Sequence, residues 1–324
     1  MRNRARRHRA LAAALIMACT PAAPLLAQCG FRQAFTRPDE RGTQTVTVFE
    51  GDPVPALGNA RPLLFITSLK VNTDGTKISY HQDDPTGRRC RQNPASAPCA
   101  INNIRNAYRN PARPESEFTA LRDAGYPLPR TWQVLSDNII EKNRTTGKPC
   151  ITPDGYLVSM TADVAVNGGF TRVGDCDPAK WIDALAVPAI VVPKSAPALP
   201  SQFVQKGVGK RSLVIALSRS ATRRIVSGIV GDLGPASEIG EATVAMNRAL
   251  NGLPETEQPK HRQDAIDRFQ AGRTAVVVFP GTQSVMARPL TAPRVAQAGD
   301  DALTKFGGVD QLYRCIQQEV DPMF

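Results

Sequence analysis

Short runs of β-branched and apolar residues recur along the chain, separated by glycine, proline, asparagine and aspartate. Runs of this length bounded by turn-forming residues predict strands. The strands expected on this basis are 43–49, 62–66, 68–71, 77–81, 132–140, 156–160, 187–193, 213–217, 224–230 and 274–279. The pair Asp74-Gly75 predicts a hairpin turn that returns 77–81 along the preceding strand. Prolines at both ends of 187–193 favour an edge strand or a strand start.

Helical spacing of apolar residues covers fewer stretches. It predicts short helices at 102–108 and 115–124, a charged helix at 260–269 and a closing helix at 301–320. A further helical pattern opens at Gly240-Glu241 and stops at Asn251-Gly252. Many short strands with few short helices predict a mainly β fold of the α+β class, barrel-like rather than parallel α/β.

The stretch 225–250 holds the strongest candidate for chemistry. A β-branched run breaks at a Gly-rich turn, which places Asp232 at the end of a predicted strand and Glu241 at the start of a predicted helix. A tight turn between them can bring both carboxyl groups to one cleft, and glycoside hydrolysis uses such a pair. The structural alternative is that Asp232 is a turn residue and Glu241 a carboxylate favoured by the helix dipole.

The N-terminus carries an export signal. A basic segment at 1–9 precedes an apolar segment ending in small residues, which predicts a signal peptide over 1–27. Pro21 and Pro24 interrupt the apolar run, so no stable membrane span is expected. Cys19 leaves a lipoprotein as the alternative. We therefore expect a secreted or periplasmic monomer, with an N-terminal extension at 28–61 and one catalytic domain at 62–324.

Charge and cysteine content change once the signal is set aside. Five arginines belong to the signal, which lowers the formal net charge from +11 to +6 and removes much of the case for a nucleic-acid partner. Six cysteines remain, and an even count in an exported chain predicts disulfides. Of the fifteen possible connectivities, proximity and pairing of the termini favour Cys90–Cys99, Cys150–Cys176 and Cys29–Cys315.

Motifs for several other classes are missing from the sequence. There is no CxxC pair, and only His81 and His261 lie outside the signal, so neither a metal site nor a Ser/His/Asp set is predicted. No phosphate-binding glycine loop and no GxSxG elbow is found, so no nucleotide or other cofactor is expected.

Several segments together resemble glycoside hydrolase family 75, the fungal-type chitosanases and their bacterial relatives. They are KVNTDG at 70–75, SYH at 79–81, VPAIVVP at 187–193, VGDLGP at 230–235, IGEA at 239–242 and VVFPG at 277–281. The resemblance covers about 62–281, and the block containing Asp232 and Glu241 is its most specific part. The order of strand, Gly-Asp turn and short element also resembles the double-psi β-barrel of some lytic transglycosylases.

The resemblance implies endo-hydrolysis of β-1,4 linkages in a glucosamine polymer with inversion of configuration. The family's essential Asp and Glu correspond to Asp232 and Glu241. The substrate-binding residues expected around them are Lys70, Asp74, Tyr80 and His81. Apolar neighbours favour Glu241 as the general acid, although a helix N-terminus there would oppose the rise of its pKa. Asp232 then activates the water.

Two departures keep other functions open. Fungal members carry an acidic, cysteine-containing DxDCDG-like segment where this chain has Asn72 in place of one acid, and this chain is basic overall. An acidic cleft around Asp74, Asp83, Asp232 and Glu241 would favour a chitosanase. A cleft lined by Lys and Arg would favour an enzyme acting on peptidoglycan or another envelope amino-sugar polymer. Carboxyls buried in salt bridges, with no open groove, would favour a non-catalytic envelope protein.

Overall fold

The computed structural model describes residues 29–40, 42–166, 174–219 and 223–324. The predicted signal peptide at 1–27 and the alternative lipid site at Cys19 lie outside these residues. Within them, no helix combines the length and the apolar character needed to cross a membrane.

Six strands close into a mixed β-barrel. Their order around the barrel is β3 (Leu63–Asn72), β10 (Ala271–Phe279), β7 (Leu213–Ser218), β8 (Ile225–Gly234), β6 (Ala189–Pro193) and β9 (Glu241–Thr243), and β9 pairs again with β3. The pairings β6–β8 and β3–β9 are parallel, whereas the others are antiparallel. The predicted barrel-like fold of mixed strands and short helices is therefore confirmed.

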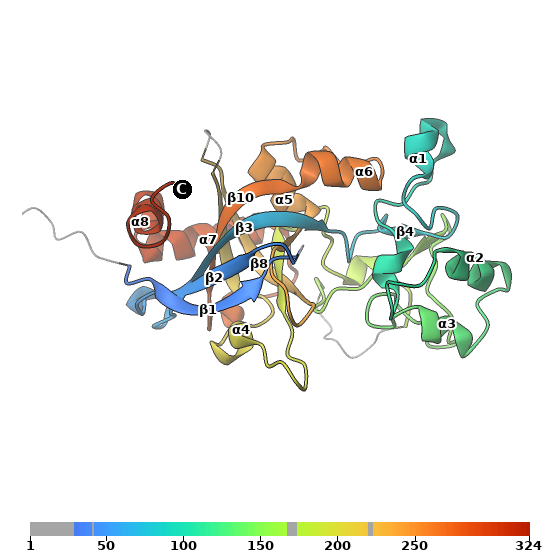
Figure 1. The fold of residues 1–324 in the computed structure, drawn as a ribbon, viewed down its shortest axis with the longest axis horizontal. Coiled ribbons are helices and arrows are strands. Elements are labelled where there is room, and N and C mark those ends of the chain that lie inside the picture. The colour runs from blue at the N-terminus through green and yellow to red at the C-terminus, as the bar shows by residue number, and fades with distance from the viewer. Residues whose placement is uncertain (1–28, 41, 167–173, 220–222) are drawn as a thin grey trace, which may run out of the picture.

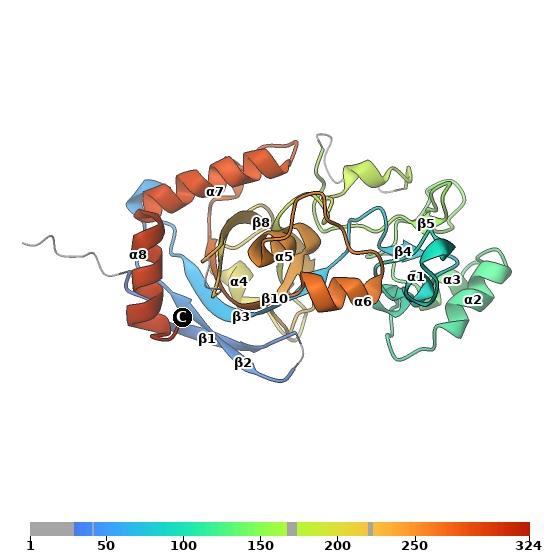
Figure 2. The ribbon, with the colours of Figure 1, turned by 90° about the horizontal axis from the view of Figure 1, so that it is seen from above.

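Alternation along the strands builds two cores. One face of every barrel strand contributes to a buried cluster that fills the interior, including Leu63, Phe65, Ile190, Val214, Val230, Ala242, Val276 and Val278. The opposite faces of β7, β8 and β10 pack under α7 (Ala292–Phe306) and α8 (Gly308–Cys315). Figures 1 and 2 show these two helices at one end of the molecule. The barrel is thus a packed core, and chemistry has to occur on its rim or outer wall.

An N-terminal hairpin extends the sheet. β1 (Arg32–Pro38) pairs with β2 (Thr45–Glu50), and β2 pairs with the first residues of β3 (Figure 1). The strand predicted at 43–49 is confirmed as part of this hairpin. The disulfide Cys29–Cys315 ties the start of the hairpin segment to α8.

A long connection joins β3 to β6, and its described residues, 73–166 and 174–188, form a second body that we call the insertion lobe (Figure 1). It contains β4 (Tyr80–His81), β5 (Tyr156–Leu157), α1 (Arg89–Gln92), α2 (Ser116–Asp123) and α3 (Arg130–Val134). It has its own hydrophobic cluster and two disulfides, Cys90–Cys99 and Cys150–Cys176. All three predicted disulfides are therefore confirmed.

The remaining helical elements are short connectors and caps. They are α4 (Gln202–Gln205), α5 (Val244–Asn251), α6 (Arg262–Asp264) and the single turns Pro55–Leu57, Pro94–Ser96, Ile104–Ala107, Pro178–Lys180, Ala265–Phe269, Gln283–Val285 and Ile316–Val320. Of these, α5 matters most for the site, because it follows β9 directly and packs Met246 and Leu250 into the barrel interior.

Several local predictions were wrong, and for the strands the reason is that pairing with distant strands overrides local turn chemistry. No hairpin forms at Asp74-Gly75, because β3 pairs with β2, β10 and β9, while β4 pairs with β5. Residues 130–134 form a helix instead of part of a strand. The strand at 187–193 is interior rather than an edge, since β6 is paired on both sides. The tail forms two helices, divided at Gly307-Gly308, where both residues have positive φ.

The correction with most consequence concerns Glu241. The predicted helix does not open there: Glu241 is the first residue of strand β9, and α5 begins at Val244. The Thr243 hydroxyl caps α5 by accepting from the Met246 N–H at 3.3 Å. Glu241 therefore lies outside the helix terminus, and the dipole effect that was expected to lower its pKa does not apply.

Candidate active site

Strand register aligns Asp232 and Glu241 across β6. Asp232 of β8 lies opposite Val191 of β6, and Ile190 of β6 lies opposite Ala242 of β9. Continuing the second register by one residue places Glu241 opposite Val191. Because Ile190 and Ala242 point into the barrel and side chains alternate along a strand, Val191, Asp232 and Glu241 face outward in one row.

Glycines around Asp232 make this row possible. The register between β6 and β8 shifts between Ile190 and Val191, so that Gly231 is the extra residue of a bulge. A Cβ on Gly231 would lie 2.7 Å from the Ala189 side chain. A Cβ on Gly234 would lie 2.5 Å from Val191 Cγ1 and 3.5 Å from Glu241 Oε2. Glycine at these two positions lets β8 pack closely against Ala189 and Val191.

The Asp232 carboxyl is fixed by backbone donors. Its Oδ1 accepts hydrogen bonds from the N–H of Ala162 at 2.7 Å and of Leu233 at 2.8 Å. Burial raises the pKa of Asp232 to about 6, while these two bonds and the nearby Lys194 and Lys210 oppose the rise. Asp232 is therefore held in one orientation and is ionised at neutral pH.

The Glu241 carboxyl has the opposite character. Its one side-chain hydrogen bond comes from Asn72 Nδ2, at 3.3 Å from Oε2. Burial raises the pKa of Glu241 to about 8, and the carboxylates of Glu40, Asp74 and Asp232 add to the rise, whereas the Asn72 bond opposes it. None of the ion pairs in the described part of the chain involves Glu241, so no ion pair offsets the rise of its pKa.

Asp74 brings a third carboxyl to the row from the start of the insertion lobe. Its Oδ1 accepts from Tyr80 OH at 2.9 Å and from Ser159 Oγ at 3.0 Å. Burial raises the pKa of Asp74 to about 7, and the Asp232 charge adds to this. Gly75 permits the turn, because it has φ +87° and a Cβ there would lie 2.1 Å from the Ile182 carbonyl oxygen.

Tyr80 forms a hydrogen bond with the Asp74 carboxyl. The side chain is buried, and the hydroxyl donates to Asp74 while accepting from Asn102 Nδ2 at 3.1 Å. Tyr80 was expected to bind substrate. Its buried hydroxyl instead contacts the carboxyl of Asp74, and substrate binding by Tyr80 stays a prediction.

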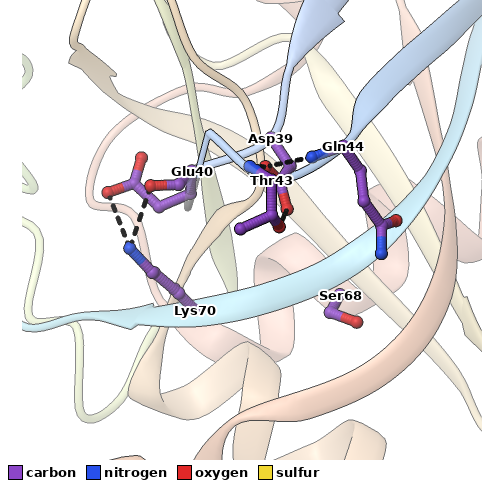
Figure 3. Close-up of a pocket in the computed structure, with 6 residues that line it drawn as sticks. All are labelled: Asp39, Glu40, Thr43, Gln44, Ser68 and Lys70. Carbon is purple, nitrogen blue, oxygen red and sulfur yellow. Dashed lines mark hydrogen bonds and ion pairs between the residues drawn. The ribbon is translucent and has the colours of Figure 1, made fainter.

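Lys70 lies at the edge of the site and pairs with an acid that sequence reasoning missed. In the β3–β9 register Lys70 is opposite Glu241. Its Nζ donates to the Glu40 carboxylate at 3.3 Å and to the Glu40 carbonyl oxygen at 3.0 Å (Figure 3). A small cavity of about 50 Å³ adjoins this pair, lined by Asp39, Glu40, Thr43, Gln44, Ser68 and Lys70. Glu40 belongs to the turn of the N-terminal hairpin, and no local pattern marks it.

His81 lies apart from the carboxyl row. It follows Tyr80 on β4, so its side chain points to the opposite side of the strand. Its Nδ1 accepts from the Asp83 N–H at 3.1 Å, which leaves Nε2 to donate to the Asp154 carbonyl at 2.8 Å. There it lines an open depression of about 530 Å³ with Tyr156 and neighbouring residues. Both ring nitrogens are engaged, and substrate binding by His81 stays a prediction.

Charges of both signs surround the row. Glu40 and Glu238 join the three carboxyls, and Lys70, Lys194 and Lys210 stand near them. Asp83 does not take part, because it pairs with Arg122 in the insertion lobe. The row is thus a partly exposed acidic strip with lysines at its edge, rather than a set of carboxyls consumed in salt bridges.

One group of possible metal ligands is found among the described residues, and it lies elsewhere: Cys29, Cys315 and Glu319. The two sulfurs form a disulfide, and Glu319 accepts from the N–H groups of Cys29 and Phe31. These atoms already have partners in the fold.

Comparison with known proteins adds no identification. No protein-family model matches the chain, and no curated protein matches it.

Proposed function

We propose that this protein is a chitosanase-like glycoside hydrolase that cleaves β-1,4 linkages of a glucosamine polymer with inversion of configuration. The observation that carries the proposal is the outward row Asp232–Val191–Glu241 on three adjacent strands. It joins the two residues that correspond to the essential pair of glycoside hydrolase family 75. The parallel pairs β6–β8 and β3–β9 in a closed six-strand barrel also fit the double-psi architecture expected from the resemblance.

The spacing of the row supports inversion. Asp232 and Glu241 are separated by one intervening strand, and neighbouring strands lie about 4.8 Å apart, so their backbones are roughly 9.6 Å apart. Inverting glycosidases hold their carboxyl groups about 6.5–9.5 Å apart to leave room for a water, whereas retaining enzymes need about 5–5.5 Å. The backbone separation of roughly 9.6 Å lies near the upper end of the inverting range and well above the retaining one.

The two pKa values assign the roles. Glu241, with a pKa of about 8, keeps its proton at neutral pH and donates it to the glycosidic oxygen as that bond breaks. Asp232, with a pKa of about 6, is a carboxylate there and removes a proton from the water that attacks C1 from the other face. The backbone bonds to Asp232 Oδ1 fix its orientation and leave Oδ2 for this water. Both groups have the required charge between about pH 6 and pH 8.

The acidic strip supports a cationic polymer as the substrate. Once Asp232, Asp74 and Glu40 are ionised, ammonium groups of glucosamine units are attracted to the row. Lys194 and Lys210 next to Asp232 support a second candidate, a related envelope polymer with carboxylate groups such as peptidoglycan. The three disulfides support action outside the cytoplasm, as the signal peptide predicts, and we propose that the enzyme works there as a monomer.

Release of reducing ends from chitosan and from purified peptidoglycan tests the proposal. Wild type is compared with Asp232→Asn and Glu241→Gln, which remove a carboxylate at nearly constant size. Chitosan cleavage that falls by about 10²-fold or more in both variants supports the proposal. If wild type cleaves only peptidoglycan, and both variants lose that cleavage, the site is kept and the second candidate substrate is supported. Activity that survives both substitutions contradicts the site.

A further inference from the structure

The turn between β1 and β2 is attached to the loop that carries Glu241. The Glu40 N–H donates to the Ile239 carbonyl at 2.9 Å, and the Ile239 N–H donates to the Pro38 carbonyl at 3.2 Å. The Lys70 N–H donates to the Gly240 carbonyl at 2.7 Å. Three segments distant in the sequence thus meet at the residue before Glu241, and the N-terminal hairpin is fixed against the site.

Further contacts hold the Glu40 side chain against Lys70, the residue opposite Glu241. Lys70 Nζ binds both the carboxylate and the backbone carbonyl of Glu40, as Figure 3 shows. Lys70 is itself opposite Glu241 in the parallel β3–β9 pair. The side chains of Lys70 and Glu40 are 32% and 16% exposed, so solvent screens their interactions only in part.

The groups that face Glu241 come from four elements. Glu40 comes from the β1–β2 turn, Asp232 from β8 and Glu238 from the β8–β9 loop, where it interacts with Glu40. Asp74 and Lys70 come from β3 and the segment after it. Among these charges Glu40 contributes most to raising the pKa of Glu241, ahead of Asp74 and Asp232.

Glu40 is the member of the pair that has a cationic partner, because Lys70 Nζ donates to its carboxylate. Burial raises the pKa of Glu40, but Lys70 opposes the rise by its charge and its hydrogen bond. Glu241 has only the neutral Asn72 amide as a donor. When one proton is shared between two neighbouring carboxyls, it resides on the one without a cation.

We propose that Glu40 is a positioning residue of the active site: held by Lys70 and the hairpin backbone, its carboxylate keeps the proton on Glu241. The N-terminal hairpin is then part of the catalytic unit rather than an appended extension. This inference rests on the proposed role of Glu241 as general acid, but the titration of Glu241 can be measured without any substrate.

The test is a carboxyl-carbon NMR titration of Glu241 in protein labelled at glutamate, with its signal assigned by its loss in Glu241→Gln. In Glu40→Gln the titration midpoint of Glu241 falls by on the order of one pH unit, the effect of removing one close like charge. Glu40→Asp, which keeps the charge, restores most of the shift. If Glu40→Gln does not fold, Glu40→Ala carries the same test.

Glu50→Gln is the matched control. Glu50 lies on the same hairpin but pairs with Lys206 at 2.7 Å, so its neutralisation makes the same charge change away from the row. An unchanged midpoint in Glu50→Gln and a lowered one in Glu40→Gln support the inference. Equal midpoints in Glu40→Gln and wild type overturn it, and so does an equal shift in both variants.

The pH profile of chitosan hydrolysis separates this inference from the proposed function. Glu40→Gln moves the alkaline limb of kcat/KM to lower pH by the same amount and leaves the acidic limb in place. Hydrolysis with an unmoved alkaline limb overturns the inference alone. No hydrolysis by wild type overturns the proposed function alone, because the NMR titration then still decides the position of the proton.

Discussion

The carboxyls of the barrel wall and those of the insertion lobe have opposite surroundings. On the wall, Glu241 receives one neutral hydrogen bond and faces three other acids. In the lobe, Asp84 is buried and accepts from the N–H groups of Arg88, Arg89 and Ala100 at 3.0–3.1 Å. The first arrangement makes ionisation costly, and the second supplies every donor that a carboxylate needs. Glu241 thus differs from Asp84 in its partners: burial acts on Glu241 together with neighbouring acids, whereas Asp84 has three backbone donors.

The histidine and aspartate near Asp84 teach the same lesson. His81 uses both ring nitrogens on backbone groups, and Asp83 pairs with Arg122. In the sequence, HQDD at 81–84 offers as many candidate catalytic side chains as the block around Asp232. Its polar atoms are instead engaged within the lobe, partly in local turns and partly with Ala100, Arg122 and Asp154.

The largest effect should come from exchanging a carboxyl for an amide in each region. We expect Glu241→Gln to abolish chitosan hydrolysis while leaving the fold stable, because it removes a carboxyl with unfavourable neighbours. We expect Asp84→Asn to do the reverse: it replaces an acceptor of three backbone bonds and lowers the free energy of unfolding by about 2 kcal/mol. Urea unfolding and activity per folded molecule measure both. If Glu241→Gln lowered the stability and Asp84→Asn did not, the assignment of Glu241 to chemistry and of Asp84 to structure would be contradicted.

The pH dependence of stability sharpens the comparison further. Folded pKa values of about 7 for Asp74, about 6 for Asp232 and about 8 for Glu241 lie above the ordinary carboxyl range. Groups raised in this way favour the folded state while protonated, and that stability is lost as the pH rises from about 4 to about 8. We expect the Tm to fall by at least about 2–4 °C between pH 5 and pH 8.

Glu241→Gln and Asp84→Asn also serve as controls for the pH dependence of Tm. Glu241→Gln removes one of the titrating groups and should flatten the fall in Tm, whereas Asp84→Asn should lower Tm at both pH values and leave the slope unchanged. A Tm that rises from pH 5 to pH 8 in wild type would contradict the assignment of raised pKa values to the row.

A smaller effect is expected at Asn72, which orients Glu241. Its Oδ1 accepts the Asp74 N–H at 2.9 Å, which fixes the amide so that Nδ2 points at Glu241. Asn72→Ala removes one neutral hydrogen bond worth about 1 kcal/mol, so kcat should fall roughly fivefold. The alkaline limb of the pH profile should move upward, since the bond favours ionised Glu241. Asn102→Ala, which removes the amide that donates to Tyr80, is the matched control and should leave that limb in place.

The smallest effect is expected at His81. Because its ring serves backbone groups on the far side of β4, His81→Gln should change kcat/KM for chitosan by less than about twofold, while lowering Tm. A large rise in KM at unchanged stability would instead support substrate binding in the depression that His81 lines.

The sequence was sufficient where local pattern and long-range pairing agree. The strands β7 and β10 were predicted from uninterrupted apolar runs, and β8 from an apolar run broken only by Ser227-Gly228. The six cysteines were paired correctly from proximity and chain ends. Asp232 and Glu241 were nominated together, and the structure places them in one row. Each of these features depends on composition within a few residues or on a covalent constraint.

Prediction failed where closure of the barrel decides. Asp74-Gly75 has the chemistry of a hairpin turn, yet the chain does not turn back on β3 there. The end of β3 pairs in parallel with β9 instead. The last residue of β3, Asn72, and the first residue of β9, Glu241, are 169 positions apart in the sequence. Glu241 was expected in a helix because the apolar spacing that follows it is helical. Residues 241–243 instead form strand β9, which pairs with β3. Glu40 was missed since it reaches the site only through this closure.

The most direct test of the central claim is the configuration of the first product. Proton NMR of a chitosan oligomer during the first turnovers distinguishes the α-anomer from the β-anomer before they interconvert. Asp232 and Glu241, separated by one strand and flanking a water, predict the α-anomer from a β-linked substrate, with no product from Glu241→Gln. Initial release of the β-anomer, or hydrolysis that persists in Glu241→Gln, would contradict the account.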